Sequence, residues 1–164
     1  MSTERVEVPI EVPVEVIDRI QRGTLAAVLH VAWANDSAAN EIARELHAAE
    51  AAIEAQLDKL EHSSAVATAF RGGWSREHLT RLLGECLVAS RMLEEVQLTA
   101  SVVLSRGPQE LHAYRRIVST AVDCAVREVK ESPFFHWQRV TRAERVALEQ
   151  IGKVFDAVEH DAGS

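Results

Sequence analysis

Residues 109–131 read QELHAYRRIVSTAVDCAVREVKE, and this stretch decides the fold class. Its apolar residues recur at steps of three and four, the period that places side chains on one face of an α-helix. The residues of this apolar face are Leu111, Tyr114, Ile117, Val118, Ala121, Val122, Ala125 and Val129. A Gly-Pro pair at 107–108 precedes the stretch and a Ser-Pro pair at 132–133 follows it, so both ends carry helix-interrupting residues. We expect one long helix here.

Three further stretches show the same period and predict helices over residues 37–62, 75–105 and 141–160. The last of these begins with Thr141 and Glu144, the spacing of a capping box in which each side chain accepts a hydrogen bond from the other residue's backbone N–H. The segment between the first two, around Phe70, is expected to be a connection. The sequence therefore predicts four main helices.

Two short helices are expected before them. The first begins after Pro13, and Gly23 supplies a residue that commonly ends a helix. Thr24 can then cap a second helix that ends at about Ala34. Because this second helix is apolar on all sides, we expect it to be central and buried.

Residues 1–13 predict an extended N-terminal arm, in which apolar and polar residues alternate and Pro9 and Pro13 prevent a place inside a sheet. Its apolar residues are Val6, Val8, Ile10 and Val12. This strip needs a cover, and we expect it to lie across helices or beside the same arm of a second subunit in a homodimer. The predicted domains are thus the arm, 1–13, and a helical bundle domain, 14–160.

Composition favours an ordinary folded protein, with 47% hydrophobic and 26% charged residues. The formal net charge of −7 disfavours a general role in binding nucleic acid or anionic membranes. The sequence also lacks an apolar run of the length that spans a bilayer and the pattern of a secretory signal. We expect an acidic, cytoplasmic protein that does not bind a membrane.

The weak candidates for a metal site are His47, Glu50 and Glu54, which follow one another at helical steps. Di-iron sites in helical bundles need Glu-x-x-His on two helices, and no such tetrapeptide occurs in the chain. We interpret the three residues as part of a solvated acidic face, and we expect neither a metal nor another cofactor.

No catalytic residue can be assigned from the sequence. Zinc-hydrolase, nucleophile-elbow, phosphate-loop and dinucleotide-binding motifs are absent. Cys86 and Cys124 fall on or beside the apolar faces, which favours buried thiols over nucleophiles. The sequence therefore favours a protein that is not an enzyme.

Two surface features remain. A basic set on the third and fourth predicted helices suits either a phosphate-binding face or pairing with the acidic N-terminal half of this or another chain; it includes Arg115, Arg116, Arg127, Lys130, Arg142, Arg145 and Lys153. Phe134, Phe135 and Trp137 form an aromatic cluster that either closes the end of the bundle or recognises a protein.

These observations predict an all-α protein, an antiparallel bundle of four main helices with two short N-terminal helices and an extended N-terminal arm. The expected function is non-catalytic protein–protein interaction, as a regulator, adaptor, inhibitor or scaffold component whose partner the sequence does not identify. The alternative is a helical-bundle ligand- or metal-binding protein, or an enzyme with unusual ligands.

Overall fold

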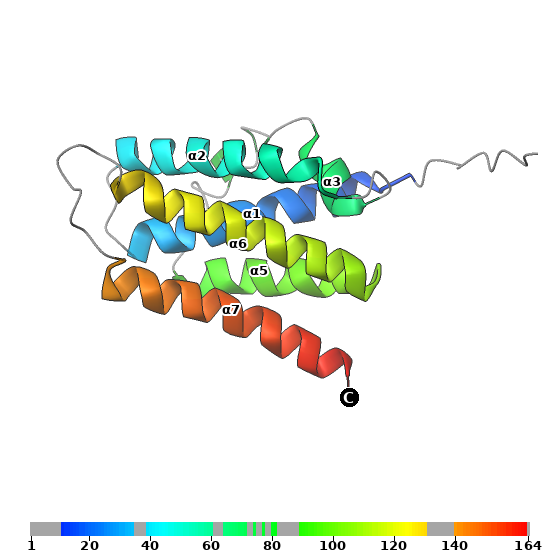
Figure 1. Cartoon of the computed structure of the whole chain (residues 1–164). Coiled ribbons are helices and arrows are strands. Elements are labelled where there is room, and N and C mark those ends of the chain that lie inside the picture. Colours follow the sequence, from blue (N-terminus) through cyan, green and yellow to red (C-terminus); the bar gives the residue numbers. More distant parts are fainter. Residues whose placement is uncertain are drawn as a thin grey trace, which may run out of the picture.

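The computed structural model describes residues 11–34, 39–60, 64–71, 74, 77, 80–81, 89–130 and 140–163. Within these residues the chain is all-α and contains no strand. The helices are α1 (Val14–Ala34), α2 (Ala39–Leu57), α3 (Ala65–Phe70), α5 (Ala89–Leu104), α6 (Pro108–Lys130) and α7 (Arg142–Ala162). Five of those described are long, and they pack side by side, with α1 and α6 running one way and α2, α5 and α7 the other (Figure 1). The expected number of four main helices is therefore too low.

The prediction of two short N-terminal helices is wrong, because α1 is one helix of 21 residues that passes through Gly23 without a break. The expectation of a buried, central segment is confirmed. Leu25, Val28 and Leu29 are fully buried, and α1 contacts each of the other five described helices. The long helices are thus arranged around α1.

Gly23 has a packing role in place of the predicted helix end. A Cβ atom at this position would overlap the side chain of Thr99 on α5 and would lie 2.6 Å from the hydroxyl oxygen of Tyr114 on α6. Thr99 uses its hydroxyl group to donate to the carbonyl oxygens of Glu95 and of Arg19 on α1, at 2.8 and 3.1 Å. The missing side chain therefore lets three helices approach closely at one point.

An ion-pair cluster fixes α1 against α5 beside this point. The guanidinium of Arg22 donates to both carboxylate oxygens of Glu95, at 2.9 and 3.1 Å, and Arg19 adds a contact of 2.6 Å. All three side chains are at least two-thirds shielded from solvent. Partial burial and two-point geometry make such a cluster more effective than an exposed pair.

The turn between α5 and α6 follows the sequence prediction. Gly107 has a φ angle of 130°, a conformation that favours glycine, and Pro108 starts the next helix, where a missing N–H costs nothing. The predicted capping box of α7 is also confirmed, with Thr141 N donating to Glu144 Oε2 at 2.7 Å and Glu144 N donating to Thr141 Oγ1 at 3.1 Å.

The segment expected to be a plain connection contains helix α3. Ser64 caps this helix, and the carboxylate of Glu110 on α6 accepts hydrogen bonds from the backbone N–H groups of Ala65 and Val66. A residue distant in sequence thus satisfies the donors at the start of α3.

None of the helices in the described ranges is long and apolar enough to cross a membrane.

Candidate functional site

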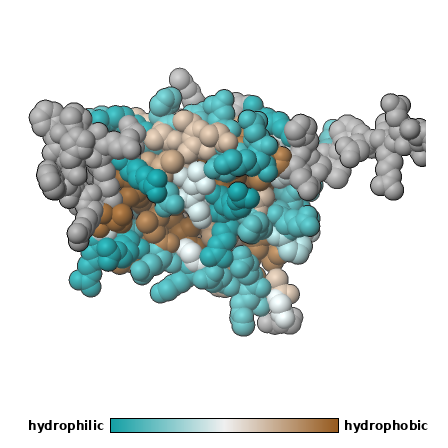
Figure 2. Space-filling view, in the orientation of Figure 1, coloured by the Kyte–Doolittle hydropathy of each residue, from teal (hydrophilic) through white to brown (hydrophobic). Residues whose placement is uncertain are grey.

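A pocket of about 600 Å³ lies where the C-terminal end of α1 meets the beginning of α7. Its lining residues are His30, Trp33, Ala34, Arg142, Ala143, Val146, Ala147 and Gln150. Figure 2 shows a hydrophobic area on the visible surface at this end of the bundle. We call this the α1–α7 pocket.

Helical spacing brings the lining residues to one face of each helix. His30, Trp33 and Ala34 follow steps of three and four on α1, while Ala143, Ala147 and Gln150 do so on α7. The capping box at Thr141 fixes where α7 begins, and hence where its first turn meets α1. The hollow exists because three alanines stand where larger side chains would fill the space between the helices.

His30 is the buried polar group of the pocket. Only 5% of the residue is exposed, and its Nε2 lies 2.9 Å from Gln150 Oε1 on α7. Burial lowers the pKa of His30, and the hydrogen bond to Gln150 offsets this only in part, so the ring is neutral near pH 7. A neutral ring that donates from Nε2 keeps a lone pair on Nδ1, which is buried and has no hydrogen-bond partner among the described residues.

The mouth of the pocket combines one cation with exposed apolar surface. Arg142 is exposed and forms no ion pair within the described part of the chain. Val146, which lines the pocket, is 45% exposed, a high value for a large apolar side chain; Val140, which does not line it, is 37% exposed. The site therefore offers an apolar interior, a neutral imidazole in its wall and a positive charge at its edge.

The polar side-chain groups of the described lining belong to His30, Trp33, Arg142 and Gln150. The described lining residues include no carboxylate, hydroxyl or thiol, and the imidazole Nε2 is already paired with Gln150. The described lining residues include neither a nucleophile with an adjacent base nor two carboxylates with different pKa values. An apolar cavity with a few polar groups is typical of small-molecule sites.

The residues predicted as interaction sites from sequence fall mostly outside the described residues. Those outside are Val6, Val8, Ile10, Phe134, Phe135 and Trp137. Cys86 is also outside the described residues. Val12 is described, is 9% exposed and packs in the hydrophobic core of its own chain. Cys124 on α6 is a half-buried free thiol.

The weak metal candidates lie on α2, where His47 and Glu54 are exposed and Glu50 is half-buried. No other element adds a ligand to them, since the described residues contain no group of three His, Cys, Asp or Glu side chains able to hold a metal ion. These three residues are not part of the α1–α7 pocket.

Sequence reasoning missed His30 and Trp33. The signal was present as a histidine within an otherwise apolar stretch, 24–34, because a buried imidazole needs a partner. That partner, Gln150, is 120 residues away and could not be identified from periodicity.

A comparison of the chain with protein-family models, curated proteins and solved structures finds no match.

Proposed function

We propose that this is a non-catalytic binding protein, and that its ligand is a small amphipathic anion held in the α1–α7 pocket. The observation that carries the proposal is an apolar cavity of about 600 Å³ whose lining includes Arg142, an arginine that forms no ion pair with any described residue. The volume lies within the usual range of ligand sites, about 300–1,000 Å³. This is the ligand-binding alternative predicted from the sequence, without a metal.

The ligand class follows from the chemistry of the lining. Trp33, Val146 and the alanines favour a flexible or planar apolar body, since burying apolar surface contributes about 25 cal/mol per Å². Arg142 favours a carboxylate or sulfonate head, because its guanidinium can donate two parallel hydrogen bonds to such a group. A medium-chain carboxylate has both features.

The test is calorimetric titration of the full chain with decanoate, decanol and decylamine, three probes with the same apolar body. We expect decanoate to bind most tightly and decylamine least. Arg142→Gln should weaken decanoate by about tenfold, the effect of losing a charge-assisted hydrogen bond, and leave decanol unchanged. Arg145→Gln is the matched control, because Arg145 is exposed on α7 and does not line the pocket.

A second pair of variants tests the cavity itself. Ala143→Leu places a larger side chain in the pocket at an exposed position of α7 and should reduce the affinity for decanoate and decanol alike. Ala157→Leu makes the same change at an exposed position of α7 outside the pocket and should have no effect. Equal effects of the two substitutions would contradict binding in the pocket.

Protein–protein interaction is the second candidate, and the exposed Val140 and Val146 favour it. In this case a partner would insert an apolar side chain into the α1–α7 pocket, and the role as regulator, adaptor, inhibitor or scaffold component stays a prediction. Affinity purification with Val146→Asp should then lose a partner that Leu98→Asp retains, because Leu98 is also an exposed apolar residue but lies on α5, outside the pocket. Retention of every partner by Val146→Asp would contradict this candidate.

A further inference from the structure

A basic groove lies at the opposite end of the molecule, where the end of α2 meets the N-terminal half of α6. Two adjoining hollows, of about 370 and 230 Å³, share Lys59, His112 and Arg116 in their walls. Gln56, Ser119 and Thr120 line the larger hollow as well. We call this the α2–α6 groove; it shares no lining residue with the α1–α7 pocket.

The shared residues carry charge that the rest of the described chain does not neutralise. Lys59 and Arg116 are exposed and form no ion pair with any described residue. Arg115, which also lines the larger hollow, differs because it pairs with Asp156 at 2.9 Å and Glu159 at 3.1 Å on α7. Two exposed cations without an ion-pair partner among the described residues thus share one groove.

Of the described residues, a single carboxylate lines the two hollows, and it is already hydrogen-bonded. Glu110 accepts hydrogen bonds from Ser64 Oγ at 3.2 Å and from the backbone N–H groups at the start of α3. Its hydrogen bonds are directed to α3, and it forms no ion pair with Lys59 or Arg116. Gln56, Ser119 and Thr120 add neutral hydrogen-bond donors around the groove. Phosphate oxygens can accept hydrogen bonds from such groups.

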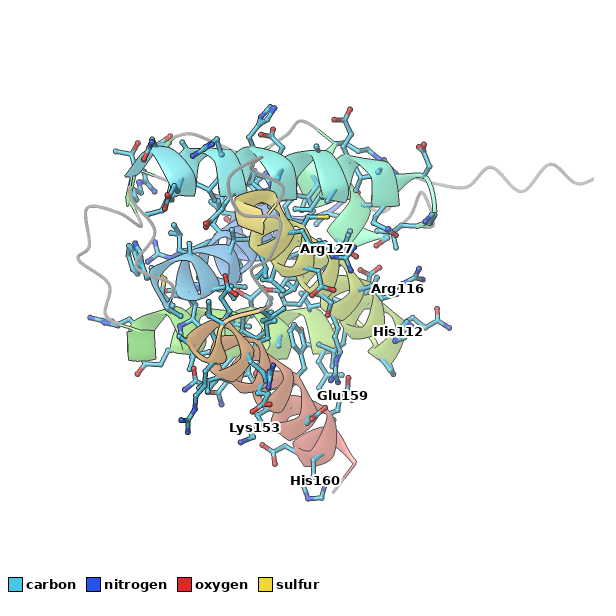
Figure 3. All side chains as sticks on the ribbon, turned by 60° about the vertical axis from the view of Figure 1, so that its left-hand side comes forward. His112, Arg116, Arg127, Lys153, Glu159 and His160 are labelled. Carbon is cyan, nitrogen blue, oxygen red and sulfur yellow. The ribbon has the colours of Figure 1, made fainter. Side chains whose placement is uncertain are left out.

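The small extent of the positive region limits the size of the ligand. Along α6, Asp123 follows Thr120 by one turn, and Asp156 and Glu159 stand beside Arg115. A long polyanion would pass over these carboxylates, none of which lines the groove, whereas a compact anion could lie between Lys59 and Arg116 inside it. Figure 3 shows His112 and Arg116 close together on α6, with Arg127 toward the other end of that helix.

We propose that the α2–α6 groove binds a compact phosphorylated small molecule, with Lys59 and Arg116 as its charge partners and Ser119 and Thr120 as neutral donors. The proposal assigns phosphate binding to only one part of the basic set that the sequence predicts as a possible phosphate-binding face. Arg115 is paired with acidic side chains, and Arg127 lies 11 residues beyond Arg116, about 16 Å along the helix axis and farther than charges act through physiological salt.

The test uses inorganic pyrophosphate as the probe, titrated into the full chain at low ionic strength and followed by two-dimensional NMR and calorimetry. We expect saturable binding with shifts confined to Lys59 and residues 112–120. Arg116→Gln and Lys59→Gln should each weaken it by about tenfold, since each removes a charge-assisted hydrogen bond. Arg127→Gln, the matched control on the same helix, should change the affinity by less than about twofold.

Three results would overturn the proposal. The first is no saturable binding of pyrophosphate by the unsubstituted protein. The second is an equal loss for Arg127→Gln and Arg116→Gln, which would indicate general attraction to positive charge. The third is tighter binding of a single-stranded oligonucleotide than of pyrophosphate, with both arginines contributing, which would indicate a polyanion surface. None of these results bears on decanoate binding in the α1–α7 pocket.

Discussion

At position 23, the absence of a side chain allows α1, α5 and α6 to meet. Gly23→Ala should therefore lower the free energy of unfolding by about 1–3 kcal/mol, the usual cost of adding a methyl group to a filled core. Overlap with the Thr99 side chain cannot be relieved by a rotamer change alone, because the added Cβ atom would lie 2.6 Å from the Cβ atom of Thr99, which a rotamer change does not move. Urea unfolding monitored by circular dichroism measures the change.

Gly152 supplies the matched control for this substitution. It lies inside α7, and a Cβ atom there would meet nothing within 4 Å. Gly152→Ala should raise the free energy of unfolding by about 0.5–1 kcal/mol, because alanine restricts the unfolded chain and favours helix. A similar effect of both alanine substitutions would contradict the packing role of Gly23.

His30 should make stability depend on pH. Burial lowers its pKa in the folded protein below the value of about 6.5 in the unfolded chain, so the unfolded state binds the proton more readily. The stabilising contribution is complete above pH 6.5 and is lost as the pH falls from there toward the folded pKa. Urea unfolding at pH 7.5 and 5.5 tests this.

The control for His30 is His30→Gln, which keeps a hydrogen-bonding group near Gln150 but cannot titrate. The substituted protein should lose less stability than the original between the two pH values. The same loss in both proteins would show that other groups cause the pH dependence.

Among the elements, α7 depends on its capping box. Thr141→Ala should lower the free energy of unfolding by about 1 kcal/mol, since the N–H of Glu144 loses its acceptor. Thr141→Ser keeps the oxygen and should stay close to the original value. Because the first turn of α7 forms one wall of the α1–α7 pocket, decanoate affinity should follow the same order.

The sequence predicted elements correctly where the decisive contacts are local. Thr141 with Glu144, and Gly107 with Pro108, act on residues within a turn of themselves, so their spacing is sufficient evidence. Gly23 was misread as a helix end, because its reason for being glycine is the approach of α5 and α6.

Distant contacts also explain what the sequence analysis missed in the site. Helix α3 needs a carboxylate from α6, and the α1–α7 pocket arises from alanines that face each other across two helices far apart in the sequence. No periodicity within a single segment contains that information. Lys59 and Arg116 are joined in one groove only by the packing of α2 against α6.

For the whole molecule, the subunit number is the main prediction that the sequence leaves to experiment. Val12 packs in the core of its own chain, so a truncation that removes residues 1–10 leaves the described fold intact. It also removes Val6, Val8 and Ile10, the strip expected to pair with the same strip of a second subunit. We expect a smaller particle in light scattering with unchanged helical circular dichroism. An unchanged subunit number would contradict a dimer built by the arms.

The central position of α1 has a consequence for how the protein opens. Its residues 23–32 are all buried and α1 contacts every other described helix, so solvent can reach their amide groups only when the surrounding helices separate. These amides should be the last to exchange with deuterium, at a rate set by global unfolding, while those near the C-terminal end of α7 exchange through local fraying. A helix near the beginning of the chain would then be the last part to lose its protection.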